Sequence, residues 1–291
     1  MSRSPWSDPR DDERLSAPRE GRVSGGASLP IDRLTLPRGI DREPVRHRGR
    51  TYRLREMDVR ALATIGTFRV VRAAEVQSMR SSREAWRGTI GHLRQEELID
   101  VKTVSINREL AAVAVLTREG KSLLDAHQER PSDRAAQTYH AGLVKPRELA
   151  HDAQLYALFQ AEAARIEVEG GRIERVLLDY ELKREYQTFL NRPRVKEVDV
   201  DDVTAFAAAH DLPIVDGHLA LPDLRIEYES PDGERHHRDV ELVTEHYSRA
   251  QLAGKSRAGF SMYRAAGARL QGGSGRSGGT PVDPHHLEWL G

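Results

Sequence analysis

Two carboxylates and one lysine in the second half of the chain have the types and spacing of a site for phosphate-ester chemistry. Asp223 follows Pro222 at the head of one predicted strand of a hairpin, and Glu241 lies among the apolar residues Val240, Leu242 and Val243 of the next strand. If the two stretches are neighbouring strands, the carboxylates lie together and offer the hard oxygen ligands that Mg²⁺ or Mn²⁺ prefers. We therefore predict catalytic roles for Asp223, Glu241 and Lys255, with Asp223 and Glu241 as the metal ligands.

This pair of carboxylates resembles the layout of the PD-(D/E)XK nucleases. In that layout a lysine usually stands two residues after the glutamate, where this chain has Val243. Lys255, on the helix expected next, would have to supply the ammonium group instead. Two alternatives stay open. One is a fold of this kind that only binds or dimerises, and the other is a structural role, in which Asp223 begins a strand and Glu241 pairs with an arginine.

Alternating and helical patterns predict the elements that would position these residues. Pro146 is well placed in the first turn of a helix, and Ser248 with Gln251 has the spacing of a capping box. The segment 183–198 is charged and has no clear pattern. The expected helices are one from Pro146 to residue 167, one over 203–210, and one from Ser248 through Tyr263. The expected strands are 175–182, 219–228 and 237–244.

A second set of polar residues lies on a predicted helix in the first half of the chain. Ser81 and Glu84 have capping-box spacing, and Trp86, Ile90 and Leu93 form one apolar stripe after them. The polar side chains off this stripe would face outward, where arginine can donate two hydrogen bonds to guanine. The predicted DNA-binding residues on this helix and on the turn near residue 107 are Arg83, Arg87, Thr89, Arg94, Asn107 and Arg108.

The elements around this helix follow the order of a winged helix-turn-helix. Helices are expected over 57–68 and 73–79, strands over 98–106 and 111–116, and a helix capped by Thr117 after them. In such a fold the third helix enters the major groove of double-stranded DNA and the hairpin contacts the backbone. A winged helix used only for protein contact is the alternative.

Charge is unevenly distributed along a chain whose net charge is zero. Residues 1–55 carry 13 Lys and Arg against 8 Asp and Glu, whereas residues 131–270 carry 19 against 24. Residues 1–50 are poor in apolar side chains, which predicts a disordered basic arm that adds affinity for DNA. The acidic balance of the second half favours a protein partner there, and a homodimer would suit a reader of paired half-sites.

The composition also narrows the classes of protein. The chain of 291 residues has no cysteine, which excludes disulfides and thiolate metal sites. It has neither a membrane-spanning run nor a secretory leader pattern, so we expect a soluble cytoplasmic protein. His236 and His237 are adjacent on a predicted strand and point to opposite faces, which disfavours a shared metal site.

The order of these modules resembles the replication-relaxation family of plasmid and mobile-element proteins. The resemblance covers about residues 55–267 and rests on the winged helix, the stretch 221–227, the strand with Glu241 and the segment from Lys255 to Tyr263. It implies DNA binding linked to plasmid replication, relaxation or conjugation, and a restriction-endonuclease-like second domain.

We therefore expect an α+β protein made of a winged helix-turn-helix and a restriction-endonuclease-like α/β domain. The expected parts are a disordered arm 1–50, the winged helix 51–130, the nuclease-like domain 139–267 and a Gly-rich flexible tail 268–291. The expected function is a DNA-binding regulator or accessory factor without a cofactor. The alternatives are a Mg²⁺- or Mn²⁺-dependent endonuclease and a protein–protein adaptor.

Overall fold

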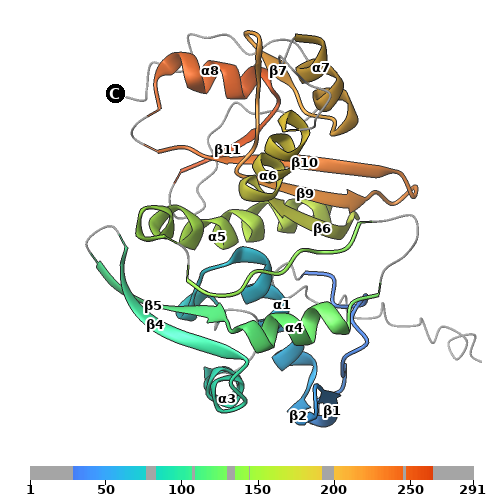
Figure 1. Ribbon diagram of the computed structural model, residues 1–291, viewed down its shortest axis with the longest axis vertical. Helices are drawn as coiled ribbons and strands as arrows, with labels where there is room; N and C mark the ends of the chain where they lie inside the picture. Colours follow the sequence, from blue (N-terminus) through green and yellow to red (C-terminus); the bar gives the residue numbers. More distant parts are fainter. Residues whose placement is uncertain are drawn as a thin grey trace, which may run out of the picture.

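The computed structural model shows a mixed α+β protein with small sheets (Figure 1). No helix in the described part of the chain is long and apolar enough to cross a membrane. The structure describes residues 29–76, 83–106, 109–129, 135–143, 145–191, 200–244 and 247–264.

The first half builds a small antiparallel sheet framed by helices. Its strands lie in the order β3-β5-β4, and the helix after the sheet is capped by Thr117, whose hydroxyl oxygen accepts from the backbone N–H of Gly120 at 3.0 Å. Within the described residues, the helices and strands expected here are confirmed with small shifts of their ends. The expected end of the helix 73–79 and the capping position Ser81 lie outside the described residues. They are α1 (Glu56–Phe68), β3 (Val71–Arg72), α2 (Ala73–Val76), α3 (Arg83–Gln95), β4 (Ile99–Ile106), β5 (Glu109–Leu116) and α4 (Arg118–Ala126).

The prediction of a disordered arm over residues 1–50 is wrong for residues 29–50, which are ordered. Leu29, Ile31 and Leu34 are buried in the core, and the chain then forms the hairpin β1 (Glu43–His47) and β2 (Arg50–Leu54). These few apolar side chains suffice because they fill space on a core built by the rest of the protein. Residues 1–28 and the tail 268–291 lie outside the described residues.

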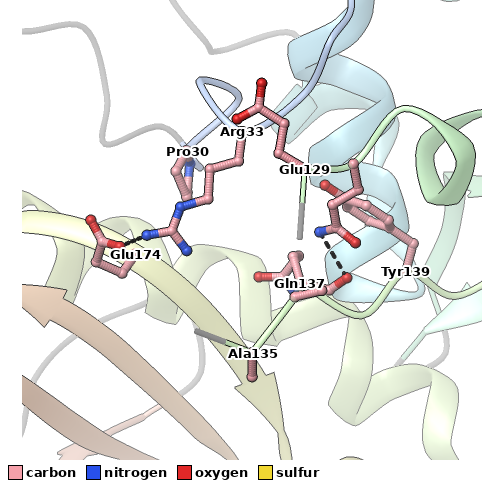
Figure 2. Close-up of a pocket in the computed structure, with 9 residues that line it drawn as sticks. Pro30, Arg33, Glu129, Ala135, Gln137, Tyr139 and Glu174 are labelled. Carbon is pink, nitrogen blue, oxygen red and sulfur yellow. Dashed lines mark hydrogen bonds and ion pairs between the residues drawn. The ribbon is translucent and has the colours of Figure 1, made fainter. Parts of the chain in front are cut away.

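The segment before the hairpin ties the two halves of the chain together. Arg33 forms an ion pair with Glu174, and the amide of Gln128 donates to the carbonyl oxygen of Gln137 at 3.1 Å (Figure 2). The cavity between them has a volume of about 10 Å³, which is room for at most one water molecule. This region is therefore a packed junction rather than a ligand pocket.

The second half builds a sheet with strand order β11-β10-β9-β6. Neighbouring strands are antiparallel except β10 and β11, which are parallel because α8 connects them. The elements are α5 (Pro146–Val168), β6 (Arg172–Leu178), α6 (Asp179–Leu190), α7 (Val200–Ala209), β7 (Ile214–Val215), β8 (His218–Leu219), β9 (Leu224–Glu229), β10 (Arg235–Leu242), α8 (Arg249–Arg257) and β11 (Ser261–Tyr263).

Three predicted elements of this half have different ends. The strand expected over 219–228 begins only at Leu224 as β9, because residues 218–219 form β8 and pair with β7. The strand expected over 175–182 stops at Leu178, because Glu181 accepts a hydrogen bond from the Leu178 N–H and opens α6 in the segment that showed no pattern. The helix expected through Tyr263 stops at Arg257. Gly259, with φ +81°, reverses the chain, and the buried residues that follow form β11.

One hydrophobic core runs through both halves. The Phe68 ring of α1 lies 5.2 Å from the Tyr156 ring and 5.1 Å from the Phe159 ring of α5, and all three are fully buried. Helix α5 lies between the first half and the four-stranded sheet (Figure 1). The elements of the two predicted domains thus pack on a shared helix.

Candidate active site

The sheet register brings the two predicted carboxylates to the same end of neighbouring strands. Val240 on β10 pairs with Leu224 on β9, so Glu241 follows opposite Asp223. The Asp223 Oδ2 atom accepts from the backbone N–H of Leu242 at 2.8 Å, which fixes the carboxylate against β10. The two residues are 18 positions apart in the chain and meet because the hairpin folds back on itself.

Lys255 reaches this pair from α8. Its Nζ atom lies 3.0 Å from Glu241 Oε1 and donates to the carbonyl oxygen of Leu221 at 2.7 Å. The three residues predicted to act together therefore lie together. The ammonium group of Lys255 thus contacts Glu241 from α8, although the usual lysine position two residues after the glutamate is occupied by Val243.

The Glu241 carboxylate is 1% exposed. Its Oε1 atom also accepts from the hydroxyl of Tyr247, and Oε2 has no hydrogen-bond partner among the described residues. Burial and the nearby charge of Asp223 raise the pKa of Glu241 to about 7, although Lys255 and Tyr247 oppose the shift. A metal cation at this carboxylate pair would offset the repulsion from Asp223 that contributes to the raised pKa of Glu241.

His151 on α5 is a member of the cluster that no sequence pattern indicated. Its Nε2 atom lies 3.2 Å from Asp223 Oδ1, and its Nδ1 atom lies 3.3 Å from Asp152 Oδ1. Burial by itself lowers the pKa of His151, but the two carboxylates outweigh it and raise the pKa to about 10. The imidazole is thus a cation at neutral pH, beside one of the predicted metal ligands.

The start of α6 adds two further residues that were not expected here. The Asp179 N–H donates to the carbonyl oxygen of Asp223 at 3.0 Å, and the Asp179 carboxylate pairs with Lys183. Burial lowers the pKa of Lys183, but Asp179, Asp223 and Glu241 together raise it. Lys183 is therefore a second ammonium group within the field of the carboxylate pair. Its segment has no sequence pattern that could have placed it there.

The carboxylate pair is suited to a hard divalent cation. In the described ranges no group of three or more His, Asp or Glu side chains is arranged to hold a metal ion. Mg²⁺, however, is commonly held by one or two carboxylates with water and phosphate oxygens completing the shell. Asp223 and the partnerless Oε2 of Glu241 fit such a site, and these two residues would hold the ion.

The predicted DNA-binding residues are placed less completely. Arg83 and Arg87 fall within α3, but their side chains are not among those that the structure describes, and Asn107 and Arg108 lie outside the described residues altogether. Arg94 is exposed, as expected.

The prediction that Thr89 faces outward is wrong. Thr89 is fully buried, and its hydroxyl oxygen accepts a hydrogen bond from the Arg55 guanidinium at 3.3 Å. It lies four residues before Leu93, on the inward face of the helix.

The basic residues expected to form an arm on DNA are partly committed to the protein itself. Arg42 Nε lies 2.9 Å from Asp58 Oδ2, and Arg50 Nη1 lies 2.7 Å from Glu97 Oε2. The first pair joins the β1–β2 hairpin region to α1, and the second joins the hairpin to the residues that follow α3.

Comparisons of the chain with family models, with curated proteins and with solved structures found no match.

Proposed function

We propose that this protein binds double-stranded DNA and cleaves it with a divalent metal ion at Asp223 and Glu241. The observation that carries the proposal is the meeting of Asp223, Glu241 and Lys255 at one end of β9 and β10. Buried acids with a shifted pKa next to a lysine are typical of catalytic sites. The resemblance to replication-relaxation proteins suggests a substrate on a plasmid or other mobile element.

The topology of the second half supports a restriction-endonuclease-like assignment. Its core order is α5, β6, β9, β10, α8 and β11, with the last strand parallel to its neighbour. This is the helix, three antiparallel strands, helix and strand that the PD-(D/E)XK layout requires. The elements α6 to β8 form an insertion after the first strand.

Each residue of the cluster has a distinct role in this proposal. Asp223 and Glu241 would hold the metal ion, which supplies charge neutralisation at the phosphate and activation of water. Lys255 holds the Glu241 carboxylate in place and presents an ammonium group that can stabilise negative charge developing on the phosphate. Tyr247 donates to the same carboxylate and orients it.

The arrangement of the first half supports the proposal that it is a winged helix-turn-helix, which would bind the DNA that the second half cleaves. Strand β3 precedes α2 and α3 and pairs with β5, so the small sheet has the order expected for that fold. On α3, Gly88 and Gly91 are exposed with open space around them, and Arg94 lies on the same side. At these two glycines the helix backbone can approach a groove closely.

The test is a cleavage assay on supercoiled and linear DNA with and without Mg²⁺ or Mn²⁺. We expect metal-dependent cleavage that falls by at least ~100-fold in Asp223→Asn and in Glu241→Gln, since each removes a charged ligand. Glu234→Gln, at the exposed far end of the same hairpin, is the matched control and should cleave normally. Cleavage that survives both ligand substitutions would overturn the proposed site.

A second candidate function is a DNA-binding accessory factor that does not cleave. The observation that favours it is the pair of internal cations, because His151 sits on Asp223 and Lys255 sits on Glu241. Both carboxylates are then neutralised without a metal ion. A salt-sensitive DNA shift without cleavage under any metal would select this function, and neither shift nor cleavage would select a protein adaptor.

A further inference from the structure

The turn between β1 and β2 and the helix α4 frame an open surface pocket of about 450 Å³. Four basic side chains line it: His47 and Arg48 from the turn, and Arg118 and Lys121 from the helix. Ser122 and Asp125 lie on the same wall. The pocket is far from the carboxylate cluster, at the opposite end of the molecule from α8 (Figure 1).

The charges of the pocket do not cancel. Lys121 is paired with Asp125. His47 Nε2 lies 2.9 Å from the Ser122 hydroxyl oxygen and 3.8 Å from Glu119 Oε1. Arg48 and Arg118 are exposed, and within the described ranges neither guanidinium has a carboxylate partner. Two uncompensated guanidinium groups converging on one pocket favour an anion with several oxygens.

Arg48 also occupies an unusual backbone position. The two-residue turn has φ +47° at Arg48 and φ +79° at Gly49, so both residues are left-handed. Asn, Asp or Gly usually occupies the first position of such a turn, because a longer L side chain is disfavoured there. The strained backbone therefore holds a long cationic side chain where a short one would fold more easily.

The hairpin that forms one side of the pocket contacts the helix that we expect to enter the DNA groove. Arg50, two residues after Arg48, is paired with Glu97 just beyond α3, and His92 of α3 donates to the carbonyl oxygen of Arg53. The turn that carries Arg48 is thereby fixed beside the C-terminal end of α3. A duplex lying along α3 has phosphates within reach of this side of the protein.

We infer that the pocket between the β1–β2 turn and α4 binds a backbone phosphate of the DNA duplex through Arg48 and Arg118. The inference rests on the proposed DNA binding and adds a phosphate-binding site outside the predicted recognition helix. Because phosphates carry no sequence information, the pocket contributes affinity that is equal on all sequences.

The experiment measures duplex affinity at several salt concentrations for Arg48→Asn, Arg118→Gln and the double variant. We expect affinity to fall about 3- to 10-fold in each single variant, on specific and unrelated duplexes alike. The slope of log affinity against log salt should decrease by about 1 for each phosphate that is no longer neutralised. Arg235→Gln, at the β9–β10 turn, removes the same charge elsewhere and should leave affinity unchanged.

Thermal melting distinguishes weaker binding from a folding defect. Arg48→Asn should melt at the same temperature as the parent or higher, since asparagine tolerates the left-handed turn. Weaker DNA binding by a variant at least as stable as the parent supports the phosphate site. Arg118→Lys should restore part of the affinity, because an ammonium group still neutralises phosphate.

The DNA-binding titrations distinguish a failure of the proposed function from a failure of the proposed phosphate pocket. A parent protein that binds no duplex overturns the proposed function. A parent that binds, with unchanged affinity and salt slope in the double variant, overturns the pocket alone. Inorganic phosphate that binds the parent but not the double variant, while both bind the duplex equally well, would also overturn it, because the pocket would then hold a small anion rather than the DNA backbone.

Discussion

At the scale of single residues, the Glu241 carboxylate is held where its charge is poorly tolerated. It is nearly inaccessible, it faces Asp223, and one of its oxygens has no hydrogen-bond partner in the described residues. Reduced stability at such positions is common in sites that act on ligands, because the same unmet charge is available for binding. Lys255 and Tyr247 reduce the cost without removing it.

Glu241→Gln is therefore expected to stabilise the protein while abolishing cleavage. The folded-state pKa near 7 is above the usual value of 4.5, so the folded state binds the proton more tightly than the unfolded chain between these pH values. The contribution of Glu241 to the stability of the parent then falls as pH rises from about 4.5 through 7. The variant has no charge to bury, so its advantage should be largest above that window and small below it.

The measurement is urea unfolding of both proteins, without metal, at roughly pH 4, 6 and 8, which bracket the two pKa values. Glu234→Gln serves as the control, because Glu234 is exposed at the hairpin turn. A variant that is less stable than the parent at the highest pH would contradict the burial argument and favour a structural ion pair with Lys255.

At the scale of elements, the helix α3 has two exposed glycines, Gly88 and Gly91. A Cβ added at Gly91 would meet nothing within 4 Å, so alanine fits there without displacing anything. Glycine inside a helix costs about 1 kcal/mol relative to alanine. Gly91, which lowers the stability of the helix in this way, lies on the face that carries the exposed Arg94.

Gly91→Ala is expected to raise the free energy of unfolding by about 1 kcal/mol and to weaken DNA binding. The added methyl group strengthens the helix but holds its backbone away from a groove. Denaturant unfolding and duplex titration on the same preparation measure the two effects. Alanine that stabilises the protein without weakening DNA binding would place the groove-binding surface on another face.

The edge of the main sheet shows another element-scale device. Strand β6 is an outer strand, and the Gln137 side chain bonds its backbone as a neighbouring strand would. The amide donates to the Val176 carbonyl oxygen at 2.8 Å and accepts from the Val176 N–H at 2.9 Å. An edge satisfied in this way is less open to pairing with another chain.

At the scale of the whole molecule, the two halves share a core through α5. Phe68 from the first half packs on Tyr156 and Phe159, and α5 in turn packs on the sheet that carries Asp223 and Glu241. Helix α5 also supplies the histidine whose imidazole touches Asp223. The helix that joins the halves thus contributes to the candidate site.

Phe68→Ala should lower the free energy of unfolding by about 3–5 kcal/mol, because it removes a large, fully buried ring. Since the core is shared, we expect one calorimetric transition in the parent and one at lower temperature in the variant. Two separate transitions, of which only one shifts, would show that the halves unfold independently. Val168→Ala, at an exposed position near the end of α5, should leave the transition in place.

The sequence was most informative where a signal is local. Pro146, Thr117 and the Ser248–Gln251 box mark helix starts that the structure confirms, because capping depends on residues three or four positions apart. The candidate carboxylates could be chosen for the same reason, since Asp223 and Glu241 lie at corresponding ends of one hairpin.

The remaining parts of the fold and of the site were decided by packing between distant segments. Residues 29–54 are too polar to fold alone, and they are ordered because the rest of the chain offers them a core. The mostly apolar residues 260–263 suit a helix as well as a strand, and only pairing with the open edge of β10 makes residues 261–263 the strand β11.

The same reason explains why the cations of the candidate site could not be predicted. His151 lies 72 residues before Asp223 in the chain, and Lys183 lies 40 before it. Neither spacing has a local signature, so only the docking of α5 and α6 against the sheet could place these cations at the carboxylate pair.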